Sequence, residues 1–175
     1  MGRALVVYES MFGNTQAIAQ AVAAGLSTRC ETELVEVSAA PTVIESDVSV
    51  VVVGGPTHAF GLTRSSTRED AARQADGPLV SPGLGLREWL DAVIAPASPV
   101  IAAAFDTRID EPRVPGSAAR GAVRRLRRRG FRVDARAESF FVSGTKGPLI
   151  TGEIDRARAW GAHLAAERAS AAVRS

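Results

Sequence analysis

Short apolar runs, each followed by a segment of helical periodicity, constrain the fold of this chain more than any other feature of its sequence. Ala4–Tyr8 and Val48–Val53 are runs of this kind, and Pro99–Phe105 is a third. A continuous apolar run is typical of a strand that is buried on both faces. Because strands that alternate with helices form a parallel sheet covered by helices, the sequence predicts an α/β fold.

The complete pattern predicts five strands in one sheet. We expect strands at 4–8, 33–37, 48–53, 99–105 and 131–142, the last with a break near 135–137, and helices at 15–26, 67–75, 86–94 and 117–129 and from about residue 153. Alternating charge in Glu33–Val37 indicates an edge strand, and Gly54-Gly55-Pro56 is expected to end the third strand. No linker or repeat interrupts the pattern, so we interpret residues 1–175 as one domain with a doubly wound sheet.

Charge and the amino-terminal segment bear on compartment and partners. The formal net charge is only +2. The amino terminus enters a strand at once, which leaves no room for the apolar region of a signal peptide, and no apolar run approaches the roughly 20 residues that span a bilayer. We therefore expect a cytoplasmic protein without membrane insertion.

The sequence predicts no metal site. It has a single cysteine, Cys30, and no Cys/His spacing typical of zinc.

An arginine-rich run, Arg124–Arg129, raises the question of nucleic acid. No aromatic residues interleave with it, and the predicted helix holds it away from the ligand end of the sheet. We interpret the run as a solvated helix face and predict no nucleic-acid partner.

The loop after the first strand separates the common identities of a doubly wound sheet. It holds one glycine, Gly13, where a dinucleotide site needs G-x-G-x-x-G, and the single lysine, Lys146, does not stand in a P-loop pattern. The third strand ends in Val53-Gly54, where a receiver domain would carry an Asp.

The same loop, Ser10-Met11-Phe12-Gly13-Asn14-Thr15, resembles the phosphate loop of flavodoxins, [ST]-x-[TY]-G-x-[ST]. Its hydroxyls, its amide and its N–H groups at a helix start suit an anion without needing a lysine. The resemblance implies an FMN cofactor and the strand order 2-1-3-4-5. It is closest to small flavodoxin-like proteins, because no insertion of about twenty residues splits the last strand. The structural alternative is that Thr15 caps the helix and Gly13 relieves the turn.

Two further loops enter the candidate FMN site through the resemblance. They contribute Pro56, Thr57, His58, Ala59, Phe60 and Gly61 after the third strand, and Phe105, Asp106, Thr107 and Arg108 after the fourth. The resemblance implies that Phe60 stacks on the flavin ring. His58 is either a proton-transfer group or a solvent-facing histidine. Phe105 also suits the buried end of its strand.

The resemblance implies a redox protein that transfers electrons through a non-covalently bound flavin to a partner protein. An alternative is an FMN-dependent oxidoreductase that uses NAD(P)H or a quinone. The sequence departs from the family at Phe12, where Thr is commoner, and in the 105–108 loop, which lacks the usual Tyr. These departures leave open a flavin-free binding module that retains the fold. The inserted segment 62–84 is interpreted as a lid, an oligomer contact or a solvated helix, and the oligomeric state stays open.

Overall fold

The computed structural model, which describes residues 2–113 and 115–173, contains one five-stranded parallel sheet with the order β2-β1-β3-β4-β5. The predicted α/β class and strand order are thereby confirmed. The strands are β1 (Arg3–Tyr8), β2 (Thr32–Glu36), β3 (Val48–Pro56), β4 (Ile101–Ile109) and β5 (Glu138–Val142). The helices are α1 (Asn14–Leu26), α2 (Ser65–Gln74), α3 (Leu86–Ala92), α4 (Ala118–Arg128) and α5 (Glu153–Val173), with a 3₁₀ turn at Val37–Ala39.

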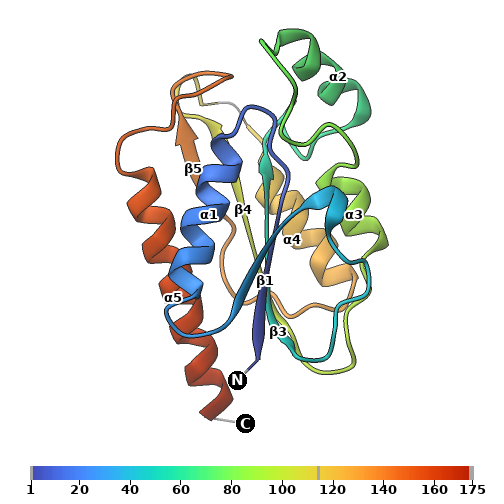
Figure 1. Ribbon diagram of the computed structural model, residues 1–175, viewed down its shortest axis with the longest axis vertical. Helices are drawn as coiled ribbons and strands as arrows, with labels where there is room; N and C mark the ends of the chain where they lie inside the picture. Colours follow the sequence, from blue (N-terminus) through green and yellow to red (C-terminus); the bar gives the residue numbers. More distant parts are fainter. Residues whose placement is uncertain (1, 114, 174–175) are drawn as a thin grey trace.

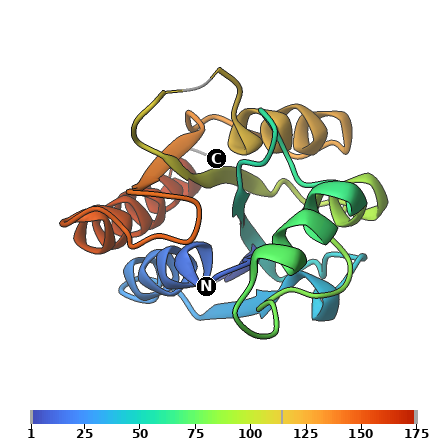
Figure 2. The same ribbon diagram turned by 90° about the horizontal axis from the view of Figure 1, so that it is seen from above.

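Helices cover both faces of the sheet, as Figures 1 and 2 show: α1 and α5 lie on one face, and α3 and α4 on the other. Alternate residues of β1 feed the two cores. Leu5 and Val7 pack toward Trp89 of α3, whereas Ala4 and Val6 pack toward α1 and α5. This two-residue period is what an extended strand imposes on its side chains. In the part of the chain that the structure describes, no helix combines the length and apolarity needed to cross a membrane.

Two strands run further than the sequence predicted. β3 continues through Gly54-Gly55-Pro56, because these residues pair with Phe105, Asp106 and Thr107 of β4. A Cβ atom on Gly54 would lie 1.9 Å from the Phe105 ring, so glycine is needed for the two strands to pair there. β4 in turn extends to Ile109, and the residues predicted as a loop after it belong to the strand.

Two smaller predictions are also corrected. In the predicted strand 131–142 only Glu138–Val142 forms β5, so the break expected near 135–137 is the true start of the strand. The helix expected at 67–75 begins at Ser65. Its start is bridged by Thr67, whose hydroxyl accepts from the Arg64 N–H at 2.9 Å and donates to the Arg64 carbonyl at 3.1 Å.

The contact between α1 and α5 depends on two glycines. A Cβ atom on Gly25 would lie 2.2 Å from the Arg158 carbonyl oxygen, and one on Gly161 would lie 2.2 Å from that of Val22. We expect Gly25→Ala to lower the free energy of unfolding by about 1–3 kcal/mol, because the two helices must move apart. Gly77→Ala, at a site with no atom near the added Cβ, is the control. Equal urea midpoints for the two variants would contradict this account of the crossing.

Candidate functional site

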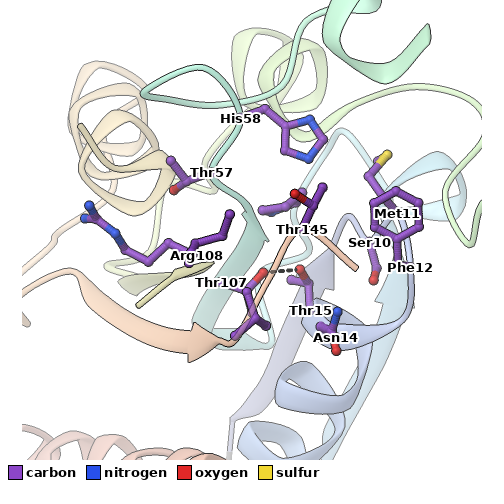
Figure 3. A pocket seen from close by; sticks show the side chains of 13 residues that line it. Ser10, Met11, Phe12, Asn14, Thr15, Thr57, His58, Thr107, Arg108 and Thr145 are labelled. Atoms are coloured by element: carbon purple, nitrogen blue, oxygen red, sulfur yellow. Dashed lines mark hydrogen bonds between the residues drawn. The ribbon is translucent and has the colours of Figure 1, made fainter. Parts of the chain in front are cut away.

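A cleft opens at the carboxyl ends of β1, β3 and β4, where the winding of the sheet reverses (Figure 3). This is where doubly wound sheets bind ligands. The first part of the cleft has a volume of about 70 Å³ and is lined by Ser10, Met11, Phe12, Asn14, Thr15, Pro56, Thr57, His58, Thr107, Arg108, Ile109, Val142 and Thr145. A second part of about 290 Å³ shares Phe12, Thr57, His58, Ile109 and Thr145 with the first and reaches α2. The second part alone approaches the roughly 300 Å³ at which ligand pockets begin.

The loop between β1 and α1 forms one wall of the cleft. The Ser10 hydroxyl accepts from the Gly13 N–H at 3.1 Å, which holds the turn. Gly13 has φ 96°, a left-handed conformation that glycine adopts without strain. α1 begins directly afterwards, and no side chain of the described residues caps its first N–H groups. These donors and the helix dipole give this wall a partial positive charge that suits an anion.

The inserted segment is fastened to this loop. The Val80 N–H donates to the Met11 carbonyl at 3.1 Å, and the Ser81 N–H donates to the Ser10 carbonyl at 2.8 Å. The Ser81 hydroxyl accepts from the Ser10 N–H at 3.0 Å. Of the three interpretations of segment 62–84, a free lid does not fit residues 80–81. These residues both donate hydrogen bonds to the 10–15 loop and accept one from it. α2 itself buries only Ala71 and is otherwise a surface helix.

Hydroxyl groups form the floor of the cleft. The side chains of Thr15 and Thr107 are hydrogen-bonded at 2.7 Å, and both residues are buried (Figure 3). The Thr15 hydroxyl therefore ties α1 to β4.

On the rim, the Asn14 amide donates to the Lys146 carbonyl at 3.1 Å, and the Lys146 ammonium forms an ion pair with Asp76 at 2.9 Å. The loop after β5, which the sequence analysis did not assign to the site, thus closes this end through Thr145 and Lys146.

Charge in the cleft is sparse. Among the described residues that line its first part, Arg108 alone is formally charged, and its side chain extends away from α1 in Figure 3. Asp70 lines the second part. His58 is half-buried between the two parts. The formal charges of Arg108 and Asp70 offset each other, so the preference of the cleft for an anion comes from the N–H groups at the start of α1.

His58 should make stability depend on pH. Burial lowers the pKa of His58 below the ordinary 6.5, and the charge of Arg68 lowers it further. A hydrogen bond to the Thr67 backbone opposes this shift but is smaller than the effect of burial. The folded chain thus binds fewer protons than the unfolded chain just below pH 6.5. The contribution of neutral His58 to the free energy of unfolding is therefore complete above pH 6.5 and is lost as the pH falls toward the pKa of the folded chain. Urea unfolding from about pH 5 to about pH 8 should show this slope in the wild type, and the slope should shrink in His58→Gln.

Two buried carboxylates, Glu9 and Asp106, support the cleft from behind, a role that was predicted for neither. Asp106 accepts from the Thr57 hydroxyl at 2.9 Å, the Ser117 hydroxyl at 2.5 Å and the Ala119 N–H at 3.0 Å. Asp106 therefore joins β4 to Thr57, the residue after β3, and to the start of α4.

Glu9, which is fully buried, accepts from the Thr63 hydroxyl at 2.5 Å and the Leu86 N–H at 2.8 Å. Burial raises the pKa of Glu9, and these two hydrogen bonds oppose that shift. An acidic residue directly after a buried strand was the available signal for Glu9.

Comparison with known proteins depends on structure alone, because no family model and no curated protein matches the sequence. The chain is similar to an oxidised flavodoxin 1 from Bacillus cereus (TM-score 0.65, 17% identity, covering 93% of this chain and 97% of that one). It is also similar to a flavodoxin from the domain Archaea (TM-score 0.61, 16% identity, 95% and 98% covered). A third similar structure is a WrbA-like flavodoxin from Agrobacterium tumefaciens (TM-score 0.53, 18% identity, 97% and 99% covered).

The chain has the flavodoxin fold.

Within this flavodoxin fold, the cleft brings together most of the candidate residues from all three loops. Those that line it are Ser10, Met11, Phe12, Asn14, Thr15, Pro56, Thr57, His58, Thr107 and Arg108. Ala59 lines only its second part. Gly13 shapes the turn, and Phe105 and Asp106 are buried and do not line either part of the cleft.

Two aromatic candidates do not line the cleft. Phe105 takes the buried strand position that was its alternative, and Phe60 lies away from the cleft. Phe105 lies in the middle of β4, and not at its end, because the strand continues to Ile109, and its ring makes edge-to-face contacts with Phe140 and Trp160. Phe60, with Gly61, lies outside both parts of the cleft, against a groove beside α4. The ring expected to stack on a flavin thus faces another site, and Phe12 is the aromatic residue that lines the cleft.

Proposed function

We propose that this protein binds FMN in the cleft and transfers electrons through it. The observation that carries the proposal is the uncapped first turn of α1, which opens into a cleft at the topological switch point of the sheet. FMN is a flavin that ends in a phosphate, and these donors suit that phosphate. The similar solved structures that are named flavodoxins support the same cofactor.

The residues present fit FMN in two respects. The phosphate would be held by N–H groups of the 10–15 loop, with Thr145 and Asn14 on the rim. The ring would lie toward the second part of the cleft, between Phe12 and His58, which suits a flat apolar group. When bound, FMN supplies one- and two-electron transfer. The chain's own contribution is to hold the phosphate, to exclude water with Met11 and Phe12 and to set the local charge.

Arg108 bears on the redox role. At an effective dielectric constant of ~20, a positive charge about 8 Å from a bound flavin would favour its reduced, anionic form by about 2 kcal/mol. Since ~1.4 kcal/mol corresponds to about 59 mV for one electron, the shift amounts to roughly 80 mV before screening. The Asp70 carboxylate, which lines the second part of the cleft, opposes this shift. A less negative potential, where the effect of Arg108 exceeds that of Asp70, suits the oxidoreductase role with NAD(P)H or a quinone.

Replacement of Arg108 tests this electrostatic effect. In spectroelectrochemical titration of the FMN-loaded protein, Arg108→Gln should make the couple of the fully reduced flavin more negative by up to roughly 80 mV. Arg132→Gln, at the opposite end of the sheet and exposed, should leave it unchanged. Equal potentials in the two variants would refute the role given to Arg108.

A flavin-free binding module is the second candidate, because Phe60 faces away from the cleft and the Thr15 hydroxyl is already bonded to Thr107. Reconstitution separates the two functions. The purified chain, mixed with FMN and passed through a desalting column, should retain a yellow chromophore whose fluorescence is quenched. If FMN elutes free while inorganic phosphate still protects the chain against thermal unfolding, the cleft is an anion site without a flavin.

A further inference from the structure

A second concave site lies on the other side of the hairpin that borders the cleft. It is a groove of about 570 Å³ between the hairpin at 58–61 and the outer surface of α4. Within residues 2–113 and 115–173, six arginines line it: Arg64, Arg87, Arg120, Arg124, Arg125 and Arg128. None of the described residues that line the groove is an Asp or a Glu. We call it the arginine groove.

Most of these arginines have no carboxylate partner. Arg125 pairs with Asp91 at 3.0 Å, outside the groove, and Arg87 donates to the carbonyls of Leu62 and Thr63. Among the ion pairs of residues 2–113 and 115–173, none involves the other four. Burial lowers the pKa of Arg87, and the charges of Arg125 and Arg64 lower it further. Asp91 and Glu88, which lie outside the groove, offset part of the charge of Arg125 and Arg87. The groove still concentrates the positive charge of the other four arginines, which form no ion pair among the described residues.

The arginines form a row. Arg120, Arg124 and Arg128 stand four residues apart on α4, so they project from one face of the helix, and all three are exposed. At 1.5 Å per residue the row extends about 12 Å. Arg64 and Arg87 line the same groove from the segment around α2 and α3. A ligand that satisfies this row must carry several negative charges over a similar length.

An aromatic side chain stands at the end of this row nearest the cleft. Phe60 is 61% exposed, at the tip of a hairpin in which Ala59 (φ 44°) and Phe60 (φ 71°) both adopt the left-handed conformation. This conformation is rare for bulky residues and is associated with functional sites. The hairpin packs against the start of α4, where a Cβ atom on Gly116 would lie 2.1 Å from the Phe60 carbonyl oxygen. Because His58 of the same hairpin lines the cleft, the two sites adjoin.

We infer that the arginine groove docks a partner protein through an acidic segment, next to the cofactor cleft. The inference deepens the proposed redox function, on which it rests, by giving the electron-transfer partner a surface and a charge. Arginine and exposed aromatic residues are enriched at protein interfaces, and guanidinium groups bind carboxylates through two parallel hydrogen bonds. A nucleic acid fits less well, since Phe60 is the only aromatic among the described lining residues and a single ring makes no stacking platform.

The docking surface can be tested without flavin. The full chain is titrated into a fluorescein-labelled oligoglutamate peptide at low ionic strength, and anisotropy reports binding. We expect the combined variant Arg120→Ala, Arg124→Ala, Arg128→Ala to bind about tenfold more weakly than the wild type. The matched control, Arg29→Ala, Arg136→Ala, Arg158→Ala, removes the same charge from exposed sites outside the groove and should bind as the wild type does. Phe60→Ala should weaken binding without any change in charge.

Three results would overturn the inference: no peptide binding at low ionic strength, equal loss in the two triple variants, or tighter binding of an oligothymidylate of matched charge through the same arginines. The last result would assign the groove to nucleic acid. Failure of FMN binding is a separate outcome, because no flavin takes part in this titration. Thermal unfolding of each variant confirms that the fold is retained, which is expected for exposed arginines.

Discussion

The Asn14→Asp chain is expected to bind FMN about 100-fold more weakly than the wild type, while its affinity for riboflavin changes little. Asn14 is the first residue of α1 and lines the cleft. At about 5 Å and an effective dielectric constant of ~20, two unit charges repel by about 3 kcal/mol, and a phosphate carries roughly 1.5–2 charges. Screening by salt reduces this sum, so about 3 kcal/mol, or about 100-fold, is the expected net cost.

The fold itself should tolerate this substitution. A carboxylate in the first turn stabilises a helix by about 0.3–1 kcal/mol, and loss of the bond from the Asn14 amide to the Lys146 carbonyl costs about 0.5–1.5 kcal/mol. Gln20→Glu adds the same charge at an exposed position further along α1 and serves as the control. Titration calorimetry of both variants with both ligands gives the comparison. If Asn14→Asp weakens FMN and riboflavin equally, the phosphate does not lie at α1.

The Asp106→Ala chain is expected to lose about 3–5 kcal/mol of free energy of unfolding. The substitution removes the acceptor of two hydroxyl groups and the Ala119 N–H, and each donor left buried without a partner costs about 1–3 kcal/mol. It also removes a negative charge beside the first turn of α4, which that helix dipole favours. The urea midpoint of the variant, measured against the wild type, gives this cost.

The isosteric Asp106→Asn variant separates charge from hydrogen bonding. Its amide oxygen can still accept from the three donors, so most of the stability should return. The amide nitrogen would take the place of Oδ1, which has no hydrogen-bond partner among the described residues. A loss as large in Asn as in Ala would show that charge, and not the acceptor, is what Asp106 provides.

The order and type of the elements were predictable from local sequence, because buried strands and amphipathic helices leave their own periodicity. Strand ends were less predictable. Gly54-Gly55-Pro56 has the composition of a turn, but pairing with β4 keeps it in the sheet. That pairing depends on the Phe105 ring filling the space over Gly54, a contact between residues far apart in the chain.

The candidate site divides in the same way. The 10–15 loop could be predicted, since a single contiguous motif carries its chemistry. The supports of the cleft could not, because Asp106 and Glu9 act through partners distant in sequence, such as Ser117 and Leu86. Phe60 shows the converse: its loop borders the cleft as expected, yet the left-handed turn at 59–60 directs it to the arginine groove. Only the three-dimensional structure reveals that direction.

The central claim is that the amino-terminal end of α1 holds the phosphate of FMN. Titration calorimetry of the wild-type chain with FMN and with riboflavin tests it most directly, since the two ligands differ only in that phosphate. Hydrogen bonds to a charged group contribute about 1.5–3 kcal/mol each, so two of them predict that FMN binds at least about 100-fold more tightly. Equal affinity for the two ligands, or no binding of either, would contradict the claim.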